Sequence, residues 1–345
     1  MVDYKKMGIF GVFGRNGSNW RLKALAIWNL IAFSYFCTLT SLTTYLVLFE
    51  MIPFIFGEFA TSVMKHDIFT CFILLQVVGN VVLVITTDSS IHNLPPLWNK
   101  PEIRNISSRK RKTTDEQKKN LVKISNQSVT RRKDADKNMN SSSAGTPEMD
   151  AKSPLHNETE EINTTVCDSC NALAPKRSHH CLLCNECILK RDHHCFFMCT
   201  CIGFYNQKYF ILWCFYMFIG SFYSLVIIAM YLKKYFNISF GMFTLLTLLP
   251  NTLYGWWFES SVIPYQLLIV GVFYACLTCG LAAAGFFYWQ LYIVLQGQTT
   301  YEAWKGILTY SDSEMLCNFK DVFGPFWYIS IFLPLPLPQK GLGVY

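Results

Sequence analysis

Charged side chains are scarce in this sequence, and four long stretches have none. Asp, Glu, Lys and Arg make up 15% of the 345 residues, whereas soluble domains carry about 25%. Hydrophobic residues reach 52%, so the composition excludes an ordinary soluble enzyme and a wholly disordered chain. The sequence also lacks the features of a cleavable signal peptide, because no small-residue cleavage site precedes the first apolar run.

The uncharged stretches have the length of membrane spans. A helix needs about 20 apolar residues to cross the hydrocarbon core. Buried helices of a soluble core are the alternative, but four such runs in one chain favour an α-helical multi-pass membrane protein. The predicted spans are residues 25–49, 68–86, 209–232 and 265–295.

A fifth uncharged run, residues 237–258, has features that disfavour a span. Pro250 and Gly255 would break a helix and leave backbone groups unpaired in lipid. We therefore predict an interfacial or luminal loop, with Trp256 and Trp257 at the level of the headgroups.

The distribution of basic residues predicts the orientation. All but three of the 30 Lys and Arg residues lie in residues 1–24, 87–208 and 296–345. Basic loops stay on the cytosolic side, so these three segments are predicted to be cytosolic. Residues 50–67 and 233–264 are then luminal loops.

Aromatic residues are almost absent from the first part of the long cytosolic insert. Residues 87–164 are predicted to be a polar linker, disordered from about residue 100. Its basic runs, 109–112 and 131–133, would alternatively attract anionic lipid. Nucleic acid is not expected as a partner, because no aromatic residues interleave with the basic ones and the segment is tethered to a membrane.

Cysteine is concentrated rather than spread out. Eight of the 14 cysteines lie between Cys167 and Cys201, together with four histidines. This pattern excludes a secreted disulfide scaffold, and its repeated C-x2-C pairs are typical of tetrahedral zinc sites. Two sites need eight ligands and twelve candidates are present. A spare cysteine beside a histidine is therefore a candidate nucleophile, although spacing alone does not identify it.

The complete motif resembles that of a known family. The Cys and His series from Cys167 to Cys201, with the central run 192–195 of Asp-His-His-Cys, resembles the DHHC-type protein S-acyltransferases, or palmitoyltransferases. Two further marks agree: residues 299–302 resemble the TTxE motif of the family, and Asn318 with residues 322–324 resembles its tail motif.

The resemblance implies two structural Zn²⁺ ions with closed coordination. Residues 165–208 would then form a small cytosolic two-zinc domain between the second and third spans. The resemblance assigns one ion to Cys167, Cys170, His180 and Cys187, and the other to Cys181, Cys184, His194 and Cys201.

The resemblance also implies the reaction. Cys195 would take a long-chain acyl group, palmitoyl, from acyl-CoA as a thioester and pass it to cytosolic cysteines of membrane-associated proteins. His193 would be the general base of Cys195, and Asp192 would orient that histidine. Lys190 and Arg191 are candidates for binding the CoA phosphates, with solvated surface side chains as the alternative.

The apolar tail of acyl-CoA belongs among the spans, since each buried CH2 gains about 0.8 kcal/mol. Gly220, Ser221 and Ser224 of the third span would leave room for the acyl chain, or would serve helix packing. We expect an endomembrane, the endoplasmic reticulum or the Golgi, rather than the plasma membrane, with a cytosolic active site.

Two departures from the family pattern keep a second function open. Residues 196–200 replace the usual Pro-Trp and Asn, and they add the thiol of Cys199, either an acyl acceptor or a buried bystander. The Asp-Pro-Gly motif after the second span is also absent, with residues 88–90 near its place. The alternative function is a catalytically impaired, membrane-tethered zinc-binding adaptor.

Overall fold

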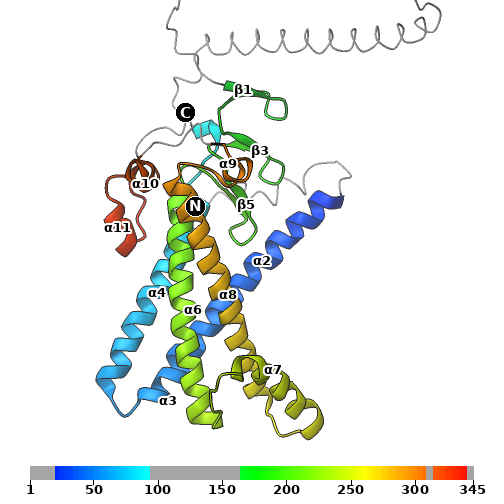
Figure 1. Ribbon diagram of the computed structural model, residues 1–345, viewed down its shortest axis with the longest axis vertical. Helices are drawn as coiled ribbons and strands as arrows, with labels where there is room; N and C mark the ends of the chain where they lie inside the picture. Colours follow the sequence, from blue (N-terminus) through cyan, green and yellow to red (C-terminus); the bar gives the residue numbers. More distant parts are fainter. Residues whose placement is uncertain (1–19, 94–163, 308–313, 340–345) are drawn as a thin grey trace, which may run out of the picture. The chain divides into compact units, whose positions relative to one another are not determined.

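The computed structural model describes residues 20–93, 164–307 and 314–339 (Figure 1). The N-terminal residues to 19 and the linker 94–163, with its basic runs and predicted disorder, lie outside this part. The chain divides into two compact units. One comprises Met1–Asn93 and Arg177–Tyr345, and the other Leu94–Lys176. Each is described by itself below.

Four helical segments of the described residues are apolar and long enough to cross a membrane. This confirms the predicted four-helix architecture, with the cysteine-rich region between the second and third helices. The first segment joins α2 (Trp20–Tyr45), the π-helical η2 (Leu46–Met51) and α3 (Ile52–Phe56); the others are α4 (Ala60–Thr86), α6 (Gln207–Phe236) and α8 (Pro264–Leu295).

The helices extend beyond the uncharged stretches that identify them. The first segment continues past Glu50 to Phe56, and the Tyr265 hydroxyl donates a hydrogen bond to the Glu50 carboxylate. Helix α4 begins at Ala60 and so includes Lys65. The first charge of a run indicates where a helix meets water, whereas backbone hydrogen bonding continues further.

The fifth uncharged run is helical, so the prediction that Pro250 breaks a helix is wrong. Helix α7 (Thr244–Tyr254) contains Pro250 and leads into the π-helical η6 (Gly255–Glu259). The Tyr274 hydroxyl accepts a hydrogen bond from Leu249 N at 3.3 Å and donates one to the Leu245 carbonyl at 2.6 Å. It thereby bridges a helical i, i+4 pair beside the proline. With 11 residues, α7 is too short to span a membrane.

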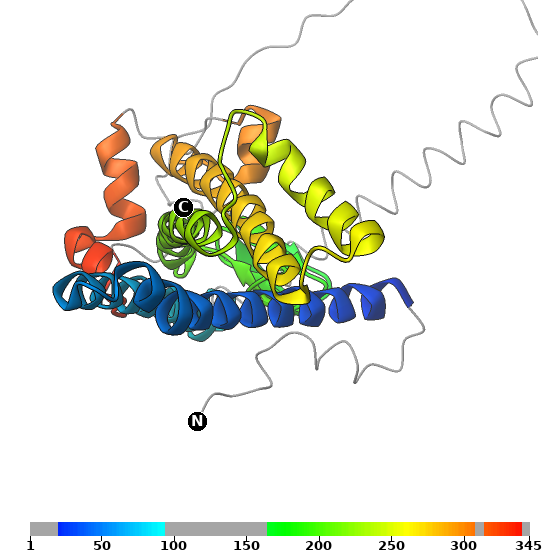
Figure 2. The same ribbon diagram turned by 90° about the horizontal axis from the view of Figure 1, so that it is seen from below.

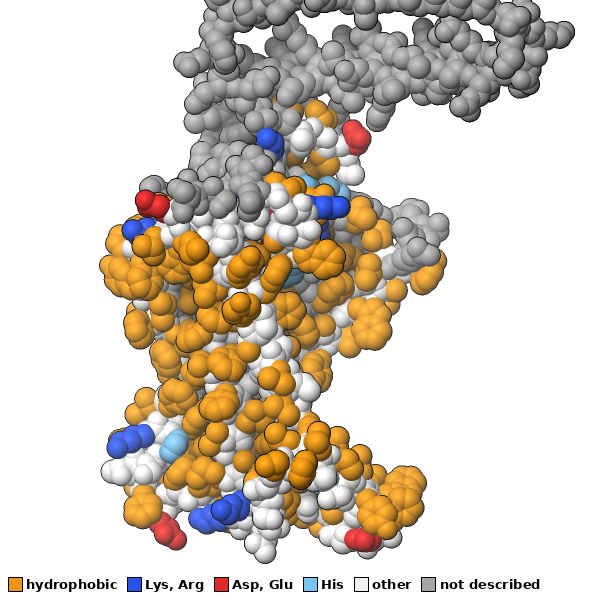
Figure 3. Space-filling model, in the orientation of Figure 1, with side chains coloured by type: hydrophobic (Ala, Val, Ile, Leu, Met, Phe, Trp, Pro, Cys, Tyr) orange, Lys and Arg blue, Asp and Glu red, His pale blue; other side chains and the backbone are white. Residues whose placement is uncertain are grey.

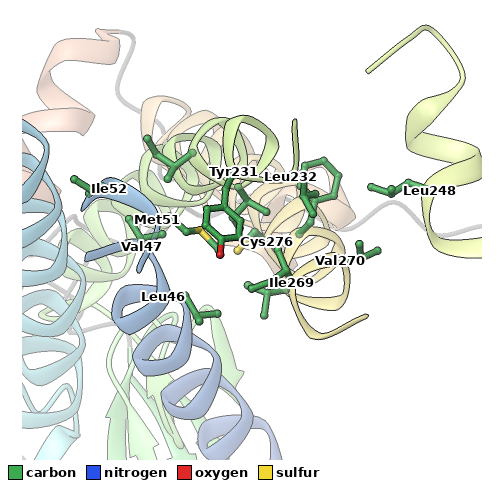
Figure 4. Packing of buried hydrophobic residues seen from close by; sticks show 14 residues of the cluster. Leu46, Val47, Met51, Ile52, Tyr231, Leu232, Leu248, Ile269, Val270 and Cys276 are labelled. Atoms are coloured by element: carbon green, nitrogen blue, oxygen red, sulfur yellow. The ribbon is translucent and has the colours of Figure 1, made fainter. Parts of the chain in front are cut away.

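The long helices pack on one another through clusters of buried apolar side chains. Buried side chains of η2, α6 and α8 meet there, among them Met51, Ile228 and Ile269 (Figure 4). Seen along the bundle, α2 runs across one side of α6 and α8 (Figure 2). The outward faces of the helices are covered with hydrophobic side chains (Figure 3). A soluble monomer rarely exposes so much apolar surface, whereas a bilayer would cover it.

The cysteine-rich region consists of three two-stranded antiparallel hairpins. The hairpin of β1 (Thr164–Cys167) and β2 (Ala172–Pro175) belongs to the second unit. The first unit contains β3 (His179–Cys181) paired with β4 (Glu186–Ile188), and β5 (His193–Cys195) paired with β6 (Thr200–Ile202). Strands this short are not stable alone, so cross-linking by metal would have a structural purpose.

The C-terminal segment returns to the helical bundle. After η3 (Ile91–Asn93) and the hairpins, the remaining short helices are α9 (Thr300–Lys305), α10 (Met315–Phe323) and α11 (Trp327–Phe332). The Tyr216 hydroxyl of α6 donates to the Ile331 carbonyl, and the Gln76 amide of α4 donates to the Phe332 carbonyl. The sequence analysis did not predict this contact between the tail and two spans.

Candidate functional site

Four predicted zinc ligands of the first unit converge. Cys181 and Cys184 lie on β3 and the turn after it, and His194 and Cys201 lie on β5 and β6. Their ligand atoms all lie within 4.8 Å of one another. The His194 Nδ1 atom is 3.6, 3.4 and 3.6 Å from the sulfurs of Cys181, Cys184 and Cys201, and the last two sulfurs are 3.7 Å apart.

These separations fit a zinc ion. Tetrahedral zinc, with bonds of about 2.3 Å to sulfur and about 2.05 Å to nitrogen, places sulfur and nitrogen ligands about 3.6 Å apart and two sulfurs about 3.8 Å apart. With four protein ligands the site is closed, as in structural zinc centres. Cys184 N also donates to Cys181 Sγ at 3.5 Å, the kind of amide contact that supports a thiolate.

The other predicted ligand set is divided between the two units. In the second unit, Cys170 N donates to Cys167 Sγ at 3.4 Å, which repeats the C-x2-C turn of the first site. In the first unit, His180 and Cys187 are directly opposite one another on β3 and β4. Each pair of residues has a geometry suited to binding a metal. That both pairs bind the same zinc ion stays a prediction.

Asp192 and His193 form a tightly held pair. His193 Nδ1 donates to Asp192 Oδ2 at 2.8 Å. The carboxylate, whose side chain is only 1% exposed, also accepts from Gln290 Nε2 at 2.7 Å, Thr300 N at 2.6 Å and Thr300 Oγ1 at 3.1 Å. Four donors from three elements thus fix the orientation of Asp192, and through it that of the His193 ring.

The electrostatics of the pair favour a charged histidine. Burial lowers the pKa of His193, but the hydrogen bonds and charges of Asp192 and Cys195 raise it overall to about 9. Burial raises the pKa of Asp192, but the bonds from His193, Thr300 and Gln290 bring that pKa below its ordinary value. An imidazolium at His193 would place a positive charge beside Cys195.

Cys195 opens onto an apolar cavity among the spans. The cavity has a volume of about 270 Å³ and is lined by side chains of α2, α4, α6 and α8, with His193, Cys195 and Phe196 at the end nearest the hairpins. Along α6 its lining runs from Phe210 to Ser224, which at 1.5 Å per residue corresponds to about 20 Å. Its shape suits one long apolar chain with its head at Cys195.

Small residues of α6 line the cavity, as the sequence predicted. Gly220, Ser221 and Ser224 all border it. The same residues also allow close packing: a Cβ on Gly220 would lie 2.8 Å from Ile73, and one on Gly280 would lie 2.9 Å from Ser221. The small residues therefore border the cavity and also allow close helix packing, and a role in holding an acyl chain stays a prediction.

A polar cluster lies at the other end of the cavity. The Tyr223 hydroxyl is 3.0 Å from His66 Nδ1 and accepts from Thr70 Oγ1 at 3.5 Å. Tyr223 and Thr70 both line the cavity. Their hydroxyl groups thus add polar atoms to the otherwise apolar lining of the cavity.

Lys190 and Arg191 lie further inside than a surface pair would. Lys190 is 5% exposed, and burial lowers its pKa to about 8, despite the opposing charges of Glu302 and Asp192. Burial lowers the pKa of Arg191, but Cys201 and Cys181 raise it above its ordinary value. Arg191 therefore lies beside the sulfurs of Cys181 and Cys201. With zinc bound, the thiolates of this ligand set would still leave a net negative charge next to Arg191. A phosphate-binding role for either residue stays a prediction.

A buried ion pair connects the first hairpin of this unit to the TTxE-like segment. Arg177 Nε and Nη2 donate to the two carboxylate oxygens of Glu302 at 2.7 and 2.6 Å, and Nη2 also donates to Gly297 O at 2.9 Å. Glu302 and Thr299 form a capping box at the start of α9, which presents Thr300 to Asp192. The sequence identified Glu302 only as part of the TTxE-like segment, and it did not predict the pairing with Arg177.

Sequence reasoning missed two amides in the spans that reach the site. Gln290 of α8 donates to Asp192 and accepts from Gln207 Nε2 at 3.1 Å. Asn29 of α2 lies against His194. The available signal was the rarity of polar side chains in these apolar helices, because a buried amide needs a partner.

Comparison with known proteins agrees with this geometry. Residues 160–307 match the family model of the DHHC palmitoyltransferase domain. Palmitoyltransferase ZDHHC22 of Danio rerio is 38% identical over 49% of this chain and 56% of its own length, and the Homo sapiens ZDHHC22 is 33% identical over 50% and 60%. Probable palmitoyltransferase ZDHHC24 of Danio rerio is 32% identical over 51% and 60%.

The matches to these relatives span less than two thirds of the relatives' own length, and the family model matches the region that holds the site. In this region the Asp-His-His-Cys run, a tetrahedral Cys3His ligand set and the TTxE-like segment occur together. Residues 160–307 are therefore similar to the DHHC palmitoyltransferase domain both in sequence and in the residues that form the site.

Proposed function

We propose that this protein is a protein S-acyltransferase that transfers a long-chain acyl group, palmitoyl, from acyl-CoA to cysteines of membrane-associated proteins. The observation that carries the proposal is the position of Cys195. It follows a histidine held by a buried carboxylate, and it lies at the end of an apolar cavity among four membrane helices.

Binding would place the two halves of acyl-CoA in different media. The acyl chain would enter the cavity, with a gain of about 0.8 kcal/mol for each buried CH2. The CoA head would stay in the cytosol, where Lys190 and Arg191 are the proposed phosphate contacts. The thioester carbonyl would then lie at the Cys195 sulfur.

The first step forms an acyl-enzyme. The Cys195 thiol gives its proton to His193, and the thiolate attacks the carbonyl carbon of acyl-CoA. Asp192 stabilises the resulting imidazolium through the bond to Nδ1. The carbon–sulfur bond to CoA breaks, and the CoA thiolate leaves with the proton from His193.

The second step repeats this chemistry with a protein thiol. A cysteine of the acceptor protein gives its proton to His193, and its thiolate attacks the Cys195 thioester. Cys195 leaves as the thiolate and recovers the proton. The net reaction exchanges one thioester for another and needs no further reactant.

The zinc ions would be structural. The fit of the Cys181, Cys184, His194 and Cys201 set supports one ion, and the second is proposed at Cys167, Cys170, His180 and Cys187. Bound zinc would hold together hairpins that are too short to be stable alone, and so would keep Asp192, His193 and Cys195 in place. We propose that this domain faces the cytosol, in an endomembrane.

The test is acylation of the purified full-length protein in detergent with a labelled long-chain acyl-CoA. The wild type and Cys317→Ser, which removes an exposed thiol of the tail, should acquire hydroxylamine-sensitive label. Cys195→Ser should acquire none and should retain its zinc. If the wild type stays unlabelled while binding zinc, the protein is the zinc-binding adaptor instead.

A further inference from the structure

Helix α2 makes its polar side-chain contact with the zinc-ligand set through a buried residue, Asn29. Asn29 is 1% exposed, and its amide lies 2.9 Å from His194 Nε2. Its backbone carbonyl accepts a hydrogen bond from Cys199 Sγ at 3.5 Å. One residue of a membrane helix thus contacts both the metal-ligating strand and the turn that follows Cys195.

We propose that Asn29 is a positioning residue that orients His194 as a zinc ligand and holds the Cys195 hairpin against α2. The inference rests on the proposed zinc at this set. It depends on the proposed acyltransferase function only where activity is measured.

The protonation of His194 determines what Asn29 must supply. Nδ1 faces the three cysteine sulfurs, so with zinc bound Nε2 carries the ring proton and is a donor. Metal-bound histidines almost always donate this proton to an oxygen, which fixes the ring and raises the basicity of the ligand. Asn29 is therefore expected to offer its carbonyl oxygen to Nε2.

The surroundings of the amide agree with that requirement. Asn29 Oδ1 is buried without a hydrogen-bond partner, while Nδ2 is the atom that faces His194. A half-turn of the amide exchanges the two atoms, which differ little in size. After this turn, the acceptor Oδ1 of Asn29 faces the Nε2 donor of His194, where the donor Nδ2 had faced it before. The helix does not have to move.

The rest of the α2 face makes this contact part of a packed interface. Ala26, one turn before Asn29, packs in a buried cluster with Cys181, Cys199 and Cys201. About two and three turns further along, Phe36 and Leu39 line the cavity. Asn29 therefore lies on α2 between the residues that pack on the zinc ligands and the residues that line the cavity. Because His193, His194 and Cys195 are consecutive in β5, a shift of His194 would also move His193 and Cys195.

The test compares zinc retention in the full-length protein without acyl-CoA. Asn29→Leu removes the hydrogen bond, whereas Asn29→Asp keeps an acceptor oxygen and lacks the NH2 group. The matched control is Asn80→Leu, which replaces another fully buried asparagine, on α4 and away from the zinc ligands. Competition with a chromophoric chelator measures how readily each protein releases zinc.

We expect Asn29→Leu to release one equivalent of zinc at a chelator concentration about 10–100-fold lower than the wild type needs. This is the usual loss of metal affinity when the hydrogen-bond partner of a ligand is removed. Asn29→Asp should stay near the wild type, as should Asn80→Leu. Zinc retention by Asn29→Leu equal to that of the wild type would overturn the proposal. So would an Asn29→Asp variant that loses zinc as Asn29→Leu does, because the acceptor oxygen would then not be what matters.

A kinetic measurement separates positioning from general stability. In the acylation assay, Asn29→Leu with zinc resupplied should show a lower kcat with little change in KM for acyl-CoA, since the cavity itself is unaltered. An unchanged kcat would contradict the link from Asn29 to Cys195. If even the wild type fails to acylate, the zinc comparison still decides the role of Asn29.

Discussion

His193 and His194 are neighbours in the chain, yet their ring nitrogens have different partners. His193 Nδ1 donates to Asp192, and His194 Nδ1 lies among three cysteine sulfurs. In an extended strand, successive side chains point to opposite faces, so β5 can direct one histidine to the Asp192 carboxylate and the next to the proposed zinc site.

This difference predicts separable phenotypes. His194→Ala should lose zinc and thermal stability together. His193→Ala should keep its zinc content and melting temperature, and should slow acyl-enzyme formation by roughly 10²–10⁴-fold, as expected for loss of a general base. Elemental analysis, thermal unfolding and single-turnover acylation measure the three quantities.

The pH dependence of the His193→Ala defect has a definite sign. An ordinary thiol ionises without the help of a base as pH approaches about 8.5. The defect should therefore shrink as pH rises from 7 to 9. Zinc loss in His193→Ala, or a defect independent of pH, would show that the roles of the two histidines are wrongly assigned.

The zinc-ligand residues were predictable from sequence, whereas their supporting partners were not. The C-x2-C spacing of Cys181 and Cys184 is local, and a tight turn is enough to bring both sulfurs to one metal. Asn29 and Gln290 reach the site only because helices distant in sequence pack beside the hairpins. Nothing local distinguishes them from other polar residues in a span.

At the scale of elements, α9 is held to the hairpins by the Arg177–Glu302 pair. Both side chains are almost completely buried, and removing one partner leaves an unpaired charge that costs about 3–5 kcal/mol. Arg177→Met should therefore lower the thermal unfolding temperature and slow acylation, because α9 presents Thr300 to Asp192.

The double variant Arg177→Met/Glu302→Gln should be less destabilised than the sum of the single variants, since no charge then stays buried alone. Lys305→Met, an exposed change on the same helix, is the control and should match the wild type. Additive losses in the double variant would mean that the two residues do not act as a pair.

Helix α6 supplies much of the cavity wall, so its small residues predict acyl-chain selectivity. Gly220→Leu would place a side chain between α6 and Ile73 and shorten the cavity. Acylation by long-chain acyl-CoA should fall by roughly tenfold or more relative to a shorter acyl-CoA, because methylene groups in an apolar pocket carry this order of discrimination.

The control for this change is Gly271→Leu, since a Cβ at Gly271 of α8 meets nothing within 4 Å. Competition between acyl-CoAs of two chain lengths measures the preference. An unchanged preference in Gly220→Leu would show that the acyl chain does not occupy this cavity.

Helix ends and the fifth apolar run show the limits of charge patterns. Uncharged runs identified all four long helices, because lipid excludes charge. The helices continue past the predicted spans where a charged residue finds a partner, as Glu50 does in Tyr265. Helix α7 was missed because Tyr274 compensates for irregular bonding beside Pro250, and that partner lies on another helix.

At the scale of the whole molecule, the arrangement suits the proposed substrate, which has one part in the membrane and one part in water. A substrate with an apolar chain and a polyanionic head requires a reactive group where the two media meet. In this protein the helices enclose the apolar cavity, the hairpins hold Asp192 and His193, and Cys195 belongs to both. Membrane anchoring would also concentrate acceptor proteins at the same surface.

The most direct test of the central claim is the location of the acyl group on the wild-type protein. After a single turnover with long-chain acyl-CoA, peptide mass spectrometry should find a hydroxylamine-sensitive acyl group on Cys195. Cys199, whose pKa burial raises to about 12, should be unmodified, as should the exposed Cys317. An acyl group on Cys199 or Cys317, with Cys195 unmodified, would contradict the account.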